Sequence, residues 1–202
     1  MNERQSHVRY DTLHINLWGS PGVGKAGISG QLYGKLKEAG YVAMLVHDYA
    51  EELALQGKLA WREIETDEIR EFDQFILSSE QYRRESEMEG SVEVVVTDAP
   101  LLQQTIFAPG HYAGELRHIL NQMTVGWTSM DVLLTGGVRP DYTSMGRVQT
   151  AEHSLALQPE ILAILNEDRP NYMTMATEGS TQELFALAVD HLQRKRTFRR
   201  TI

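Results

Sequence analysis

The sequence predicts an α/β fold in which helices cover both faces of a parallel sheet. Strand-like and helix-like segments alternate along the 202 residues, and a glycine-rich turn joins the first strand to the first helix. Such alternation is typical of parallel strands joined by right-handed crossovers. The expected strands are short apolar runs, as in a sheet buried on both faces: Leu13–Trp18, Tyr41–Val46, Val92–Thr97, Asp131–Thr135 and Asn171–Ala176.

Apolar residues recur at helical spacing between these strands. The first expected helix carries Ile28, Leu32 and Leu36 and stops at Gly40, and the others cover Tyr49–Gln56, Asp67–Glu89, Gly114–Met123, Thr150–Leu165 (interrupted at Pro159) and Thr181–Arg196. In the long helix Asp67–Glu89 we expect one stripe to pack on the core, formed by Phe72, Phe75, Ile76, Ser79 and Tyr82.

The composition is that of an ordinary globular protein, with 42% hydrophobic and 23% charged residues. We expect a single domain over residues 1–202. No apolar run approaches the roughly 18–20 residues of a membrane span, and the first ten residues are polar, so we expect a cytoplasmic protein. The absence of cysteine excludes disulfides, thiolate zinc sites and cysteine nucleophiles.

The charge is unevenly distributed along the chain. The formal net charge is −9, but residues 194–202 contribute +5, so the remainder carries −14. The body should repel polyanions, whereas this basic tail should attract them. Two interpretations of the tail stay open: contact with nucleic acid, or a solvated helix end whose cations complement the helix dipole.

A phosphate-binding loop is the most specific motif in the chain. Gly19, Ser20, Pro21, Gly22, Val23, Gly24 and Lys25 match its first seven positions, and they lie between a predicted strand and a predicted helix, as the motif requires. Glycines let backbone N–H groups wrap the phosphates, and the helix N-terminus adds a favourable dipole. Lys25 adds positive charge beside the β and γ phosphates. We therefore expect a nucleoside triphosphate to bind here.

The eighth position departs from the motif. Ala26 replaces the serine or threonine whose hydroxyl normally ligates magnesium. Either carboxylates and water hold the metal without that hydroxyl, or the protein binds nucleotide weakly and has lost turnover. The rest of the catalytic set favours retained activity.

Two aspartates follow predicted strands at the sheet edge where ligands bind in such folds. Asp98, at the end of Val92–Thr97, is placed to orient magnesium and its water shell, or else caps the following turn. Asp48 follows Tyr41–Val46, where an acceptor hydroxyl would need a proton acceptor, so we expect it to be the general base. Its alternative is a cap for the helix that begins at Tyr49. We expect His47 to be structural.

Arginines supply the mobile positive charge that phosphoryl transfer needs. Arg139 and Arg147 flank a glycine-containing polar segment, about residues 136–150, that suits a mobile lid. Their alternative is to be solvated loop residues. Arg83 and Arg84 either contact acceptor phosphate or pair with Glu80 and Glu87 at helical spacing, and the second interpretation is favoured.

Three segments together resemble the phage and bacterial P-loop kinases related to the nicotinamide riboside kinase domain, including phage 5-hydroxymethyluracil DNA kinases. The segments are residues 15–25, residues 96–101 (Val-Thr-Asp-Ala-Pro-Leu), and residues 146–150 (Gly-Arg-Val-Gln-Thr) followed by Glu152. The resemblance implies a three-layer fold with five parallel strands, ATP with magnesium, an arginine-bearing lid, and transfer to a hydroxyl of a nucleoside-like acceptor.

By position in this family, Lys25 would hold phosphate, Asp98 would serve the metal, Arg139 and Arg147 would be lid residues, and Asp48 would be the acceptor-side carboxylate. The leading acceptor is the hydroxymethyl group of 5-hydroxymethyluracil in phage DNA, which places the enzyme in the host cytoplasm. A base in duplex DNA would have to leave the stack to reach Asp48. The alternatives are a kinase for nucleoside monophosphates or nicotinamide riboside, and a nucleotide-binding regulatory protein without turnover.

Overall fold

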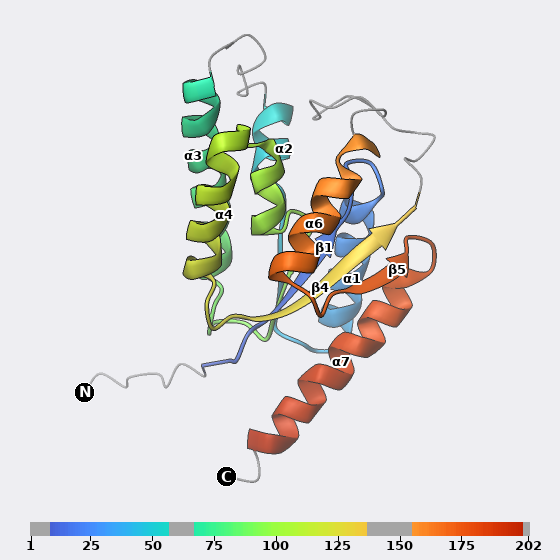
Figure 1. Cartoon of the computed structure of the whole chain (residues 1–202). Coiled ribbons are helices and arrows are strands. Elements are labelled where there is room, and N and C mark those ends of the chain that lie inside the picture. The colour runs from blue at the N-terminus through green and yellow to red at the C-terminus, as the bar shows by residue number, and fades with distance from the viewer. Residues whose placement is uncertain (1–8, 57–66, 137–154, 200–202) are drawn as a thin grey trace, which may run out of the picture.

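Five parallel strands form the centre of the molecule. The computed structural model describes residues 9–56, 67–136 and 155–199, and its strands lie in the order β2-β3-β1-β4-β5 (Figure 1). Every pairing between these strands is parallel. Their bounds are Leu13–Trp18 for β1, Ala43–Val46 for β2, Val94–Thr97 for β3, Thr128–Thr135 for β4 and Met173–Ala176 for β5. The predicted α/β fold with a five-stranded parallel sheet is confirmed.

Helices cover both faces of this sheet (Figure 1). Helices α1 (Lys25–Glu38) and α7 (Ser180–Arg199) pack on one face. The other face carries α3 (Asp67–Ser86), the 3₁₀ helix η2 (Leu101–Phe107), α4 (Gly110–Met123) and α6 (Gln158–Asp168), and α2 (Tyr49–Leu55) contacts α3. The sequence did not predict η2. Of the helices described, none is long and apolar enough to cross a membrane.

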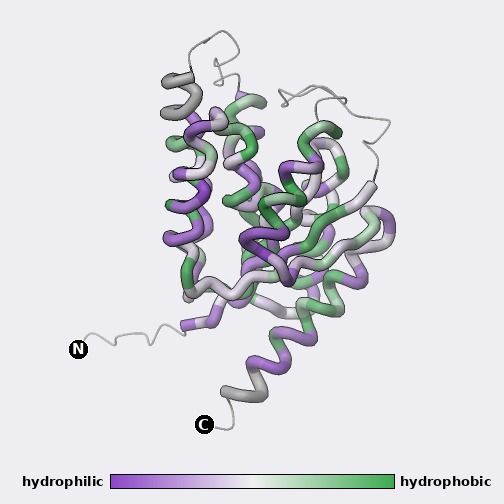
Figure 2. The backbone as a smooth tube through the Cα atoms, viewed as in Figure 1, coloured by the Kyte–Doolittle hydropathy of each residue, from purple (hydrophilic) through white to green (hydrophobic). Residues whose placement is uncertain are grey.

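The alternating side chains of β1 separate two different environments. Leu13, Ile15 and Leu17 are fully buried against α1 and α7. Figure 2 shows hydrophobic and hydrophilic stretches alternating along α7, as in a helix with one buried face. The residues between them on β1, which are His14, Asn16 and Trp18, face the other layer. One face of the sheet is therefore apolar, and the other carries buried polar groups.

The predicted core stripe of α3 was wrong at Phe75 and Ile76, whereas Ser79 and Tyr82 are half-buried and the Tyr82 ring stacks on Trp127 with centroids 5.7 Å apart. The side chain of Phe72 lies outside the described residues. Phe75 and Ile76 are 40% and 46% exposed, and the residues that α3 buries are mostly polar: Gln74, Leu77, Ser78, Gln81 and Glu85. These polar groups have partners: Gln74 Nε2 donates to the carbonyl of Gln104 at 2.9 Å, and Gln81 accepts from the backbone N–H of Tyr49 at 3.1 Å. The helix is turned toward a polar sheet face, where hydrogen bonding rather than apolar area decides which side is buried.

Glu85 is the most buried carboxyl group of this polar layer. It accepts from Gln81 Nε2 at 3.2 Å, and its Oε2 lies 3.9 Å from His14 Nδ1. The other ring nitrogen of His14 contacts Glu89 at 2.7 Å. Burial raises the pKa of Glu85, and the nearby imidazole and Gln81 only partly oppose that effect.

We predict that the free energy of unfolding of Glu85→Gln, measured relative to that of the wild type, increases as the pH rises. Because the folded-state pKa of Glu85 is raised, the native protein holds this proton more tightly than the unfolded chain does. Wild-type stability therefore falls as the pH rises from the unfolded value of about 4.3 through the folded one. Glutamine keeps an acceptor for Gln81 and removes the titration. The difference should reach on the order of 1–3 kcal/mol in urea unfolding between acid and neutral pH.

The exposed Glu87→Gln variant, on the turn that follows α3, is the matched control for loss of a carboxylate. A stability difference between Glu85→Gln and wild type that stays constant with pH would contradict the assignment.

Candidate nucleotide-binding site

The phosphate loop connects β1 to α1 in a conformation that only glycine adopts easily. Gly19, Gly22 and Gly24 have φ angles of 145°, 86° and 101°. At Gly19 a Cβ atom would also lie only 3.0 Å from the carbonyl oxygen of Leu134 and 3.0 Å from Val23 Cγ1. The loop therefore requires glycine at its first position for space as well as for dihedral angle.

Lys25 is the first residue of α1, and its side chain folds back over the loop. Its Nζ donates to the carbonyl oxygens of Gly19 at 2.7 Å and Ser20 at 3.2 Å. Gly24, at the N-cap position, has no side chain to cap the helix. The positive end of the α1 dipole and a lysine ammonium thus lie at one point, an arrangement that attracts phosphate.

Gln103 holds the first glycine of this loop with both atoms of its side-chain amide. The Gly19 N–H donates to Gln103 Oε1 at 3.1 Å, and Gln103 Nε2 donates to the Gly19 carbonyl at 3.0 Å. Gln103 lies in η2 and is 5% exposed. The sequence analysis missed this residue, although two adjacent glutamines in an otherwise apolar run just after Asp98 were a usable signal.

Asp98 follows β3 and is 5% exposed. Its Oδ1 is buried and receives no hydrogen bond from the part of the chain that the structure describes. Its Oδ2 lies 3.7 Å from His47 Nδ1. The side chain of His47 is 60% exposed and pairs with this carboxylate, and the expectation that His47 is structural stays a prediction. The nearby carboxylate of Asp98 raises the pKa of His47, against a smaller opposite effect of burial.

Asp48 is the N-cap residue of α2. Its Oδ1 accepts from the backbone N–H of Ala50 at 2.9 Å and of Glu51 at 3.4 Å, so the predicted alternative, a cap, is confirmed. Burial raises the pKa of Asp48, the charge of Asp98 raises it further, and the two N–H groups and Lys25 act against this. A carboxyl with a raised pKa is a stronger base, so a role in proton transfer is compatible with the cap and stays a prediction.

Magnesium fits this site through one carboxylate. The Oδ1 atom of Asp98, which is buried and has no hydrogen-bond partner among the described residues, is the kind of oxygen atom that this ion or its bound water prefers. Ala26 is exposed and offers no ligand, and the hydroxyl of Ser29, one turn later, is bound to the Ala26 carbonyl at 2.9 Å. In the described ranges no three acidic or histidine side chains gather as a metal cluster. The residues that are present would therefore hold the ion largely through water and phosphate oxygens.

The remaining predicted residues divide into three groups. Arg139, Arg147 and nearly all of the predicted lid (136–150) lie outside the described residues. Arg83 pairs with Glu80 and Glu87, and Arg84 pairs with Glu80 and Glu52, which confirms the favoured interpretation. In the basic tail, Arg194 pairs with Asp190 at 2.8 Å and Lys195 with Asp11 at 2.6 Å.

Comparison with solved structures agrees with this architecture. The fold is similar to that of a thymidylate kinase from Candida albicans. The TM-score is 0.60 at 11% sequence identity, and the match covers 91% of this chain and 92% of that one. The sequence matches no protein-family model, and no curated protein sequence matches it. The likeness confirms the P-loop kinase fold, while the resemblance to nicotinamide riboside kinases and phage DNA kinases stays a prediction.

We predict that Gln103→Met weakens nucleotide binding about tenfold while the fold persists. Methionine has a similar length but removes both hydrogen bonds to Gly19, each worth about 0.5–1.5 kcal/mol. Titration calorimetry with ATP measures the affinity, and the melting temperature checks the fold. The control is Gln104→Met, because Gln104 is equally buried and its side chain makes no hydrogen bond to the described part of the loop. Equal ATP affinities for the two variants would contradict the assignment.

Proposed function

We propose that this protein is a phosphotransferase that moves the γ-phosphoryl group of ATP to a hydroxyl of a nucleoside-like acceptor. The observation that carries the proposal is the glycine loop with Lys25, held between β1 and α1 beside two carboxylates, Asp98 and Asp48. These carboxylates follow β3 and β2, so both lie at the carboxyl edge of the sheet, where ligands bind in this fold class. Likeness to a thymidylate kinase adds support from the fold.

Each residue has a distinct role in this proposal. The loop N–H groups and the N-terminus of α1 bind the phosphates. The Lys25 ammonium exchanges its two carbonyl partners for phosphate oxygens. Asp98 and water would hold magnesium, whose positive charge would offset the charge that develops on the transferred group. Arg139 and Arg147 close over the phosphates from the predicted lid.

Asp48 accepts the proton of the attacking hydroxyl. Its raised pKa makes it a better proton acceptor than a solvated carboxylate, and its two hydrogen bonds from the start of α2 keep it in place. Within the described part of the chain only Oδ1 of Asp48 accepts hydrogen bonds, both from the cap of the helix, so Oδ2 is available to the acceptor there. The same residue can thus orient the helix and take part in the reaction.

A small nucleotide is the acceptor that the structure favours. Arg194 and Lys195 of the basic tail are engaged by Asp190 and Asp11, which reduces the charge available for DNA, and the rest of the chain is strongly acidic. The fold likeness to a thymidylate kinase agrees with a nucleoside monophosphate. The 5-hydroxymethyl group of 5-hydroxymethyluracil in phage DNA is the second candidate, supported by the three tail arginines at positions 196, 199 and 200.

Transfer of label from γ-labelled ATP tests this proposal. The acceptors are deoxynucleoside monophosphates, nicotinamide riboside, ordinary duplex DNA and duplex DNA that contains 5-hydroxymethyluracil. We expect magnesium-dependent label in a nucleoside monophosphate. Label only in the modified DNA would select the second candidate.

The Ala26→Ser variant, assayed in parallel, restores the missing hydroxyl at an exposed position. Label with the variant but not with the wild type would show that Ala26 has removed turnover. ATP binding without label in either protein would overturn the phosphotransferase and leave a nucleotide-binding protein.

We predict that Asp48→Asn lowers kcat by about 10²–10⁴-fold, the range for loss of a general base, with ATP affinity nearly unchanged. Asparagine retains the oxygen that caps α2, so the fold and the position of the helix should persist. Glu51→Gln, on the first turn of the same helix, is the control for loss of one negative charge. If kcat of Asp48→Asn equals that of the wild type, Asp48 is not the general base and only caps α2.

A further inference from the structure

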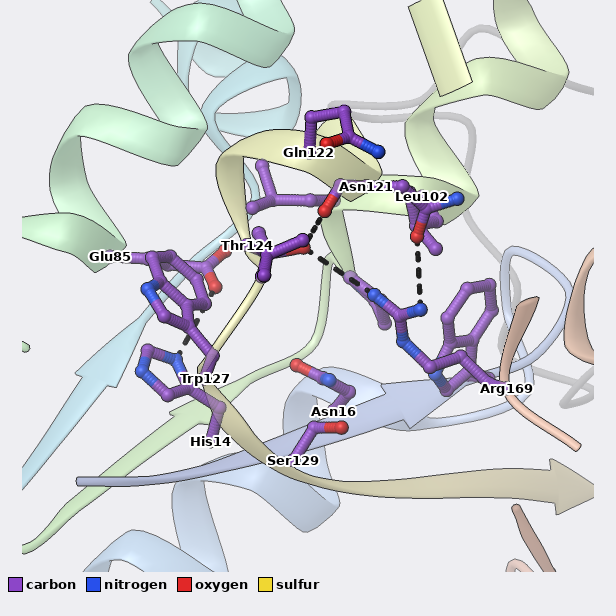
Figure 3. Close-up of a pocket in the computed structure, with 14 residues that line it drawn as sticks. His14, Asn16, Glu85, Leu102, Asn121, Gln122, Thr124, Trp127, Ser129 and Arg169 are labelled. Atoms are coloured by element: carbon purple, nitrogen blue, oxygen red, sulfur yellow. Dashed lines mark hydrogen bonds and ion pairs between the residues drawn. The ribbon is translucent and has the colours of Figure 1, made fainter. Parts of the chain in front are cut away.

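A cavity with a mixed polar and apolar lining lies on the sheet face covered by α3, η2 and α4 (Figure 3). Its volume is about 310 Å³, and β1, β4, η2, the end of α4 and Arg169 contribute its walls. Two wall residues are sequence neighbours of residues at the phosphate loop. Trp18 precedes Gly19, and Leu102 precedes Gln103, which makes two hydrogen bonds to Gly19. The proposed phosphotransfer uses none of the residues in these walls.

The polar wall of the cavity is fixed by one buried carboxylate. Asp131 is 7% exposed and accepts from Asn16 Nδ2 at 2.9 Å, Ser129 Oγ at 2.9 Å and Trp18 Nε1 at 2.8 Å. Arg169 Nε lies 3.8 Å from the same carboxylate. Side chains that neighbouring groups hold in this way lose little entropy when a ligand binds.

The ionisable groups around the cavity have partners. Asp131 compensates Arg169, and the His14 ring lies between the carboxyl groups of Glu85 and Glu89, of which Glu85 holds its proton more tightly because burial raises its pKa. A charged ligand would find no unpaired group of opposite charge in the cavity wall. Burying a charge without a partner is costly, so the cavity favours a neutral ligand. Polar capacity remains, because the buried His14 Nδ1 makes no hydrogen bond with any described residue.

Flat apolar surfaces complete the lining. The indoles of Trp18 and Trp127 are part of it, together with Leu101 and Leu102. The His14 ring stacks on Trp127 with centroids 4.1 Å apart and planes at 12°, which holds this indole in place. The volume is at the lower end of the range for small-molecule sites, about 300–1,000 Å³. We propose that the cavity is a regulatory site for a planar, uncharged heterocycle of nucleobase size that both donates and accepts hydrogen bonds.

Direct contacts connect the cavity with the nucleotide site. Glu85 in the wall accepts from Gln81, and Gln81 in turn accepts from the N–H of Tyr49, the residue after Asp48. On the other side, Trp18 and Leu102 are the sequence neighbours of Gly19, which starts the loop, and of Gln103, which is hydrogen-bonded to Gly19. A ring bound in the cavity therefore biases both the position of α2 and the loop, and it changes ATP affinity.

Tryptophan fluorescence provides a local test. The chain has three tryptophans, at positions 18, 61 and 127, so Trp61→Phe leaves only the two in the cavity wall. This full-length protein is titrated with the free bases thymine, uracil, cytosine and adenine. We expect a saturable change in emission with at least one base, and a shift in ATP affinity when that base is at saturation. No saturable change with any of the four would overturn the proposal.

Matched variants in the Trp61→Phe background locate the binding. Ser129→Phe fills the cavity and should weaken base binding by at least about tenfold, whereas Ser129→Ala loses the same hydrogen bond to Asp131, keeps the cavity open and should bind as before. Gln122→Trp, at an exposed position of the rim, replaces Ser129→Phe if that variant melts early. Equal binding by the filled and open variants would overturn the proposal.

Asp48→Asn and Lys25→Ala separate the cavity from the nucleotide site. Neither residue lines the cavity, so the emission response should persist in both. Loss of the response in either variant would place the base at the nucleotide site and overturn the regulatory assignment.

Discussion

The position of the phosphate loop depends on how the end of β1 is held. Gln103 fixes the N–H and the carbonyl of Gly19, and Asp131 fixes the indole of Trp18 one residue earlier. The missing side chain of Gly19 lets Leu134 and Val23 approach. Because these constraints act on two consecutive residues, the turn into α1 starts from a defined point, and the backbone N–H groups that follow have a defined direction. Preorganised donors of this kind bind phosphate without first reordering the loop.

The same requirement explains the polar layer beneath α3, η2 and α4. Asp131 is buried, so its carboxylate needs further hydrogen-bond donors besides the indole of Trp18. Asn16 and Ser129 supply them. His14, two residues before Asn16 on the same strand face, draws Glu85 of α3 into the interior, and Gln81 then links Glu85 to the start of α2. The face that α3 buries thus follows from the polar side of β1. Such a layer has less apolar burial than the α1–α7 side, but it specifies one arrangement of its helices.

Most of the fold could be predicted from sequence because its signals are local. β1 was predicted with the bounds that the structure has, and the glycines and Lys25 were identified because their spacing is fixed by phosphate geometry. The buried face of α3 was not fully predicted, because the stripe formed by Ile76, Ser79 and Tyr82 has helical spacing just as Gln74, Ser78 and Gln81 do. Only the partner surface decides which of the two faces is buried. Gln103 was missed because a short 3₁₀ helix repeats about every three residues and does not give the pattern of an α-helix. The contact between His47 and Asp98 joins two strand ends, which no local pattern contains.

The absence of a hydroxyl at position 26 gives Asp98 a larger share of the site's chemistry. A buried carboxylate oxygen without a donor costs on the order of 1–3 kcal/mol, and Asp98 Oδ1 has no donor among the described residues although His47 is close to the other oxygen. Glutamine or asparagine at this position would gain partners more easily, and a small apolar residue would avoid the cost. The observed arrangement lowers the stability of the free protein at the point where a cation would raise it. This is the pattern expected where a fold gives up stability to keep a ligand site open, and it makes the described part of the site more consistent with a bound metal than with a structural turn.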